Sequence, residues 1–204
     1  MKKQGIEISW ERIGIGALGA MAHGLFASLL IGTIINTLGT RLGLPFLNEI
    51  GDFATRNVGA AMAVSIGYAL KAPPFVLYSL IAVGQAANAL GGVGGPLAVF
   101  VIALIAAFAG MLVSKMTPID LIVTPFVTIV TGVAAAWLLA PPIGYIASVF
   151  GYAIMWATEM QPFLMGILIS GIVGIVLTLP ISSAALCAAL DGLNAARLNF
   201  YCAA

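Results

Sequence analysis

Charge is what this chain has least of. Only 7% of its residues are Asp, Glu, Lys or Arg, against roughly 25% in soluble domains. No charged residue occurs in the runs 72–114, 121–158 and 160–190. Such runs are too long for the interior of a soluble domain, because about 20 apolar residues in a helix already cross a bilayer. We therefore expect a protein that is integral to a membrane.

Other absences narrow the class further. The net charge is +1 and the basic residues are scattered, so no nucleic-acid partner is expected. Cys187 and Cys202 are the only cysteines, too few for a cysteine metal site or a disulfide framework. No nucleotide-binding loop, zinc-protease motif or hydrolase serine elbow occurs. The sequence thus predicts no metal, no cofactor and no catalytic residue of its own.

What is present is apolar and helical in pattern. Hydrophobic residues make up 62% of the chain, and stretches of alternating polarity typical of membrane strands are missing. We predict an all-α, polytopic helical bundle of about six or seven apolar segments, the shorter ones being tilted, re-entrant or broken. Turns are expected at the glycine cluster 91–96 and at Ala140-Pro141-Pro142. The segments are 13–38, 57–70, 74–90, 97–113, 121–139, 143–157 and 163–179.

The few basic residues predict an orientation. Cytoplasmic loops are enriched in Lys and Arg. Of the seven basic residues in the first 115 positions, an N-terminus inside the cell leaves Arg41 and Arg56 outside. The same orientation places Lys71 and Lys115 inside. On this basis residues 1–12 form a cytoplasmic lead, residues 13–190 the membrane domain, and residues 191–204 a short tail.

Two patterns concern packing. Residues 39–56 mix charges with leucines and phenylalanines, which is typical of an interfacial amphipathic segment; a plain loop is the alternative. Small residues recurring every four positions predict close helix contacts. They are Gly16, Ala20, Gly24, Ser28 and Gly32 in the first segment, and Gly166, Ser170, Gly174 and Thr178 in the last.

Glu159 is the only ionisable residue between Asp120 and Asp191. A carboxylate is costly within a membrane and usually serves a ligand or a pathway there. Thr158 and Gln161 accompany it between two short apolar segments, as in a re-entrant turn. The alternative is an ordinary solvated loop before Pro162.

Three further polar residues lie within apolar segments. His23 is the only histidine and lies beside the small-residue stripe, so we expect it to face protein. It is either a buried structural side chain or a residue that relays protons or contacts a sugar. Gln85 and Asn88, three residues apart, could offer amides to a polar ligand or could cap the glycine turn.

Several stretches resemble a known family: ALGAMAHGLFASLLIG (17–32), LKAPP (70–74), VTP (123–125), PPIG (141–144), MWATEMQP (155–162) and LTLPISSA (177–184). They are similar to the bacterial phosphotransferase system (PTS) EIIC-like membrane proteins, in a branch also labelled perfringolysin (toxin) regulator. The resemblance covers nearly the whole chain up to about residue 189.

The resemblance implies a multi-pass permease component of the bacterial cytoplasmic membrane. Such a component binds a sugar and presents it to EIIB, which EIIA supplies with phosphoryl groups. The resemblance is also compatible with a homodimer. Better-studied branches use a glutamate in a Gly-Ile-Thr-Glu-Pro motif, which Thr158, Glu159 and Pro162 match in part. Members of this type continue further, so the chain is expected to be C-terminally truncated. The alternatives are a membrane regulator that does not transport and a non-functional fragment.

Overall fold

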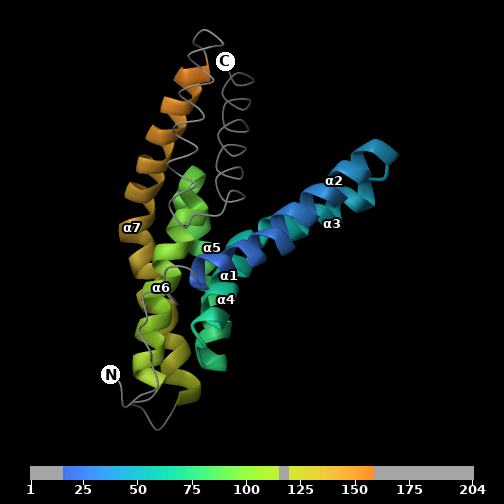
Figure 1. Cartoon of the computed structure of the whole chain (residues 1–204). Coiled ribbons are helices and arrows are strands. Elements are labelled where there is room, and N and C mark those ends of the chain that lie inside the picture. The colour runs from blue at the N-terminus through green and yellow to red at the C-terminus, as the bar shows by residue number, and fades with distance from the viewer. Residues whose placement is uncertain (1–15, 115–119, 159–204) are drawn as a thin grey trace.

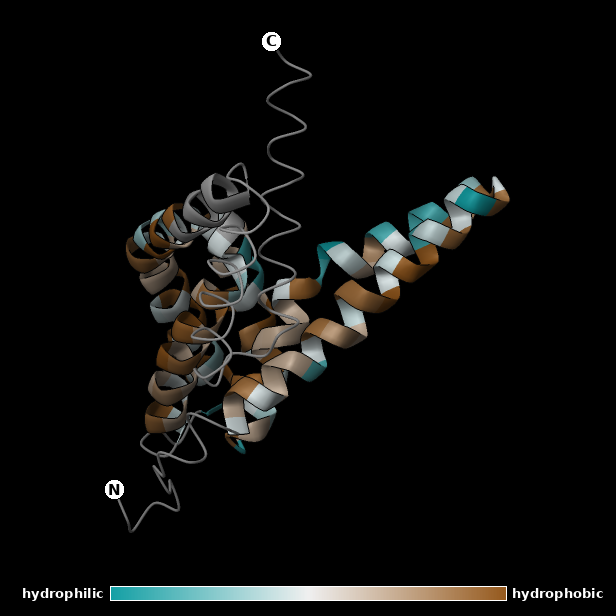
Figure 2. Ribbon diagram, turned by 45° about the horizontal axis from the view of Figure 1, so that its top comes forward, coloured by the Kyte–Doolittle hydropathy of each residue, from teal (hydrophilic) through white to brown (hydrophobic). Residues whose placement is uncertain are grey.

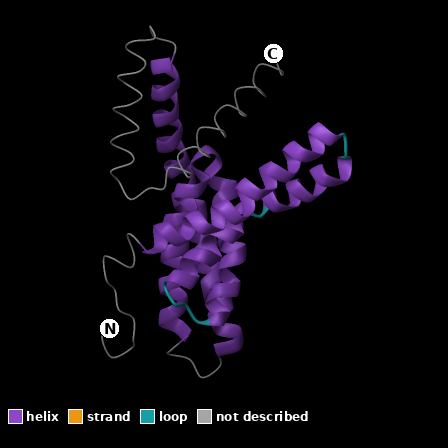
Figure 3. Cartoon of the chain, turned by 45° about the vertical axis from the view of Figure 1, so that its right-hand side comes forward, coloured by secondary structure: helices purple, strands orange, loops and turns teal. Residues whose placement is uncertain are grey.

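The structure is a computed structural model, which describes residues 16–114 and 120–158. Every regular element in these ranges is helical, which confirms the predicted all-α class (Figure 3). In chain order the elements are α1 (Ala17–Leu25), η3 (Phe26–Leu30), α2 (Ile31–Leu42), α3 (Pro45–Arg56), α4 (Val58–Ala69), α5 (Pro74–Gly91), η4 (Gly92–Gly94), α6 (Gly95–Ser114) and α7 (Asp120–Thr158).

By length and composition, several of these helices are candidate membrane spans. Four helical stretches within the described ranges are long and apolar enough to cross a bilayer, and a shorter apolar helix, Val58–Ala69, accompanies them. The four are Ala17–Leu42, Pro74–Gly91, Gly95–Ser114 and Asp120–Val149. The predicted segment 163–179 lies outside the described residues.

The bundle is built on α5, α6 and α7, which lie side by side, with α4 packed against α5 and α6 and α1 packed in turn against α4 (Figure 1). Its core contains medium-sized apolar side chains that are fully buried. These are Met62, Ile66, Val76, Leu80, Val83, Val99 and Ile102. The predicted glycine turn is confirmed as η4, where Gly92 has a φ of +51°. That left-handed conformation suits glycine and lets α6 return along α5.

The first segment is one long helical stretch with a change of pitch. After α1 a single π-helical turn, η3, leads directly into α2. The small-residue stripe predicted here is a packing face at Gly24, Ser28 and Gly32, which are buried, whereas Ala20 is half-buried and Gly16 is exposed. A Cβ on Gly24 would lie 2.5 Å from the carbonyl oxygen of Ala61 in α4, and one on Gly32 would lie 2.9 Å from that of Gly51 in α3. The second stripe, 166–178, lies outside the described residues.

α2 and α3 form an antiparallel helical hairpin that projects from the bundle (Figures 1 and 3). Gly43, with a φ of +66°, ends α2, and the amide of Leu44 donates to the carbonyl oxygen of Gly39 at 2.9 Å. Pro45 then begins α3, where its missing N–H costs nothing. Of the two alternatives for residues 39–56, the structure therefore supports the amphipathic segment over the plain loop.

The prediction of a break at Ala140-Pro141-Pro142 is wrong. α7 continues from Asp120 to Thr158 with Pro125, Pro141 and Pro142 inside it, so the expected fifth and sixth segments are one helix. The buried face continues on both sides of these prolines: Ala136 and Ala140 are fully buried. Beyond them, a Cβ on Gly144 would lie 2.5 Å from the carbonyl oxygen of Gly91. Tertiary packing thus outweighs the hydrogen bonds that the prolines remove.

Candidate functional site

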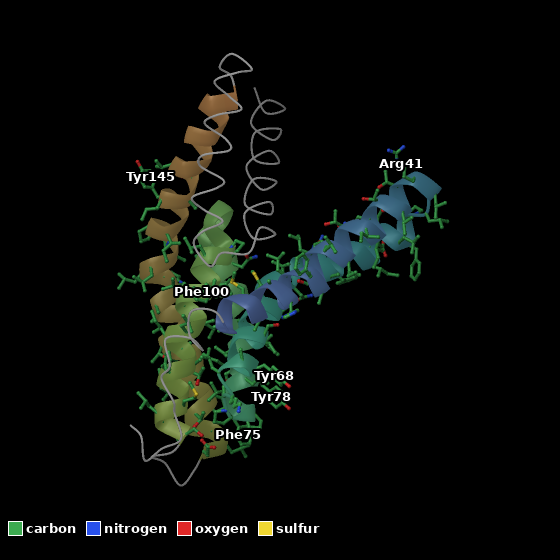
Figure 4. The ribbon with its side chains drawn as sticks, in the orientation of Figure 1. Arg41, Tyr68, Phe75, Tyr78, Phe100 and Tyr145 are labelled. Carbon is green, nitrogen blue, oxygen red and sulfur yellow. The ribbon has the colours of Figure 1, made fainter. Side chains whose placement is uncertain are left out.

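The hairpin divides its polar and apolar side chains between two faces. The polar side chains of α2 are Thr33, Asn36, Thr37, Thr40 and Arg41, and those of α3 are Asn48, Glu49, Asp52, Thr55 and Arg56. A hydrogen bond from Nδ2 of Asn36 to Oδ1 of Asp52, 3.0 Å long, joins the two helices on this side. Figure 2 shows hydrophilic residues along one edge of the hairpin and hydrophobic residues along the other. Arg41 lies at its far end (Figure 4).

A chain of polar contacts leads from the hairpin to the bundle. Oδ2 of Asp52 lies 4.0 Å from Nη2 of Arg56. The backbone carbonyl oxygen of Arg56 accepts a hydrogen bond of 2.8 Å from Nε2 of Gln85 in α5. We call Asn36, Asp52, Arg56 and Gln85 the polar network. It connects the two helices of the hairpin, α2 and α3, with α5 of the bundle.

The polar network is open to a ligand. The side chain of Asp52 is 54% exposed and that of Arg56 is 75% exposed. An ion pair this exposed contributes at most about 1 kcal/mol to stability. Stabilisation of the fold therefore does not explain why Asp52 and Arg56 are placed together. Chemically, the network offers a carboxylate that accepts, a guanidinium that donates, and the exposed amide of Gln85, which can do both. Asn36 holds the carboxylate, and its own Oδ1 is buried. This set matches a ligand with many hydroxyl groups.

Gln85 and Asn88 have different surroundings. Gln85 is exposed and belongs to the polar network, whereas Asn88 is half-buried. A Cβ on Gly59 of α4 would lie 2.6 Å from the Cβ of Asn88, and one on Gly95 of α6 would lie 3.2 Å from the Asn88 carbonyl oxygen. Asn88 therefore packs at the junction of three helices, and Gln85 is the one that faces outward.

Within the described part of the chain, His23 does not face protein, so this prediction is wrong. α1 turns Gly24 towards α4, and the neighbouring His23 is exposed, together with Gly19 and Ala27. It makes no hydrogen bond to a residue that the structure describes. The stripe and the histidine point in different directions because residues 23 and 24 differ by about 100° around the helix.

Thr158 is the last residue of α7, while Glu159 and Gln161 lie outside the described residues. The prediction of a sugar contact here depends on a re-entrant turn between two short segments. Because α7 is one long helix, the segment before Glu159 is not short, and that basis is weakened. The roles of Glu159, Gln161 and Thr158 stay predictions.

A second polar cluster, at the opposite end of the bundle, also went unpredicted. Oδ1 of Asp120 accepts a hydrogen bond from Oγ1 of Thr124, and its Oδ2 accepts one of 3.2 Å from Oγ of Ser114. Thr124 and Thr128 are fully buried. The contacts of Asp120 hold the start of α7 against the end of α6. Oγ1 of Thr128 donates to the carbonyl oxygen of Thr124 within α7, which indicates a structural role for the cluster. Within the described ranges, no group of acidic, histidine or cysteine side chains could hold a metal ion.

These features define a polytopic helical membrane protein with an exposed polar network where a side hairpin meets its bundle. The family described as "Phosphotransferase system, EIIC" matches residues 15–204. The chain belongs to this family and is a multi-pass protein of the cytoplasmic membrane. No curated protein and no solved structure is similar enough to count as a match. Membership implies a permease-type role in a PTS, with a sugar substrate and EIIA and EIIB partners.

Proposed function

We propose that the chain binds a sugar and carries it across the membrane for phosphorylation by an EIIB partner, and that the polar network holds the sugar hydroxyls. The observation that carries the proposal is the position of Asp52. One of its carboxylate oxygens is held by Asn36 and the other lies near Arg56, while half of the side chain is exposed. A carboxylate oriented in this way can accept hydroxyl hydrogen bonds without reorganising.

The residues have distinct roles in this proposal. Asp52 accepts hydrogen bonds from two adjacent hydroxyls, and Arg56 donates to a ring or hydroxyl oxygen. Asn36 fixes the carboxylate, and Gln85 fixes the backbone of Arg56. Hydrogen bonds to charged groups are worth about 1.5–3 kcal/mol each, and a site built for them rejects analogues that lack the hydroxyl. Phosphoryl transfer itself falls to the partners.

Glu159, Thr158 and Gln161 remain candidates for a second set of sugar contacts, supported by the partial match to the family's glutamate motif. His23, as an exposed side chain on α1, is a weaker candidate. Asn88 acts in this proposal through packing and not through the sugar. Glu159→Gln keeps the size of the side chain but removes the ionised acceptor, so it separates a sugar contact from a solvated loop residue.

The test is binding and uptake of a panel of labelled sugars by membrane vesicles that contain the chain with EIIA and EIIB. We expect Asp52→Asn to weaken the affinity for the preferred sugar at least about tenfold, because a charged acceptor is lost. Glu49→Gln is the matched control: it removes an exposed carboxylate from the same helix, and Glu49 is not part of the polar network.

Two results would contradict the proposal. Uptake by Asp52→Asn equal to that of the parent would exclude the polar network as the sugar site. Folded parent protein that neither binds nor takes up any sugar of the panel would favour the alternative of a regulator that does not transport.

A further inference from the structure

The face of the hairpin opposite the polar network is covered by large apolar side chains. On α2, Ile34, Leu38 and Leu42 recur every four residues and therefore share one side of the helix; they are 48%, 50% and 63% exposed. On α3, Phe46, Ile50 and Phe53 follow one another at spacings of four and three residues and also share one side of the helix; they are 70%, 38% and 68% exposed. We call these six residues the apolar face. Because Asn36 and Asp52 meet on the polar side, both apolar rows lie on the other side.

The length and charge of α3 limit its depth in the membrane. Its 12 residues extend about 18 Å at 1.5 Å per residue, well short of the ~30 Å hydrocarbon core. Glu49, Asp52 and Arg56 all lie on this short helix, and a charge at the centre of a membrane helix costs about 2.5–3.5 kcal/mol. α3 therefore cannot be a span. Since α2 pairs with α3 along its length, both helices share the same depth.

The contacts inside the hairpin indicate what covers the apolar face. Helices that associate within membranes bring small residues together. The hairpin uses its glycines between its own two helices: a Cβ on Gly39 would meet Asn48, and one on Gly51 would meet Asn36. The apolar face offers only bulky, strongly exposed side chains. Such a surface suits fluid acyl chains better than a second helix.

We infer that the hairpin α2–α3 lies in the boundary between membrane and water, with the apolar face on the acyl chains of the lipid and the polar side towards water. The arrangement makes the hairpin an amphipathic wall that keeps lipid away from the polar network. Its charged side chains, Arg41, Glu49, Asp52 and Arg56, balance in sign. Its depth is therefore set by burial of apolar area, and anionic lipid is not required.

The test is spin-label accessibility in the full chain, with Cys187 and Cys202 replaced by serine and single cysteines introduced on each face. Phe46 and Phe53 report on the apolar face, and Glu49 and Thr37 are matched positions on the polar side. Two positions on each face allow one poorly folding variant to be set aside. The protein is reconstituted in vesicles of phosphatidylcholine, with or without phosphatidylglycerol.

We expect labels at Phe46 and Phe53 to collide with oxygen in preference to a water-soluble nickel chelate, with a ratio at least about threefold higher than at Glu49 and Thr37. The ratio should not change with phosphatidylglycerol. Equal ratios on the two faces would place the hairpin in water and overturn the inference. Spectral broadening at Phe46 that disappears on dilution with unlabelled protein would overturn it in favour of a second copy. The result does not depend on sugar uptake.

Discussion

Gly59 of α4 and Gly84 of α5 lie backbone against backbone. A Cβ on Gly59 would be 2.5 Å from the carbonyl oxygen of Gly84, and one on Gly84 would meet the carbonyl oxygen of Gly59. Two helices can approach so closely only where both lack side chains. Along α5, Gly84 is next to Gln85 and one turn from Asn88. The contact therefore fixes how α5 stands relative to the end of α3, where Gln85 reaches Arg56.

The first prediction concerns this crossing. Gly84→Val should lower the free energy of unfolding by at least about 1–3 kcal/mol, because overpacking forces the helices apart. Unfolding in detergent, followed by circular dichroism, measures the loss. Gly19→Val is the control, since a Cβ on Gly19 meets nothing within 4 Å. If both variants unfold alike, the two helices do not touch at Gly84.

The second prediction concerns the stripe of the first segment. Gly24→Leu should disrupt folding more than Leu29→Ala, because any Cβ at residue 24 would collide with Ala61 and Ser65. Leu29 is only partly buried, and its truncation removes contact area without creating a clash. The yield of monodisperse protein on size exclusion checks the order. Equal yields would mean that α1 does not pack on α4 through this stripe.

Much of this fold can be predicted from the long runs that contain no charged residue and from the spacing of small residues. The spans 74–90 and 97–113 and the glycine turn between them were predicted to within a few residues, because glycine at a positive φ and long apolar runs act locally. The continuity of α7 could not be predicted in this way. Pro141 and Pro142 favour a break locally, and only tertiary contacts beyond them, such as that of Gly144 with the backbone of Gly91, show that the helix continues along the bundle.

The polar network was less predictable than the fold. Gln85 was singled out as an isolated amide in an apolar run, and it does face outward. Asp52 and Arg56 were assigned only to an amphipathic segment, because nothing local in the sequence shows that α3 folds back onto α2. The bond between Asn36 and Asp52 joins positions 16 residues apart. It depends on a hairpin whose main indication in the sequence is Gly43-Leu44-Pro45, a helix-ending glycine followed by a helix-starting proline.

The third prediction tests the link between hairpin and bundle. Gln85→Met keeps the length of the side chain but removes the donor to the Arg56 carbonyl oxygen, and should cost about 0.5–1.5 kcal/mol of stability. If the sugar binds as proposed, its affinity should also fall, since the backbone of Arg56 is no longer held. Asn57→Ala is a useful comparison, because Nδ2 of Asn57 bonds only within its own turn, to Phe53. Equal affinity in Gln85→Met and the parent would remove Gln85 from the polar network.

The last prediction concerns α7. A continuous helix and a helix that turns back at Pro141 and Pro142 predict opposite orders for two distances between spin labels. Spin labels at Val130 and Tyr145 should be about 22 Å apart in a continuous helix, and labels at Val130 and Val149 about 28 Å, at 1.5 Å per residue. All three side chains are exposed, so labelling should not disturb the bundle. A proline kink shortens both distances by a few ångströms but preserves their order.

A turn at Ala140-Pro141-Pro142 would reverse that order, because the chain would run back towards Val130. Pulsed double-resonance spectra of the two labelled pairs therefore separate the geometries without reference to an absolute distance. Pro142→Ala should leave the longer distance unchanged or slightly increase it, since it restores one backbone donor within a helix that already exists. A shorter distance for the 130–149 pair than for the 130–145 pair would mean that α7 is two helices, and that Glu159 follows a short segment after all.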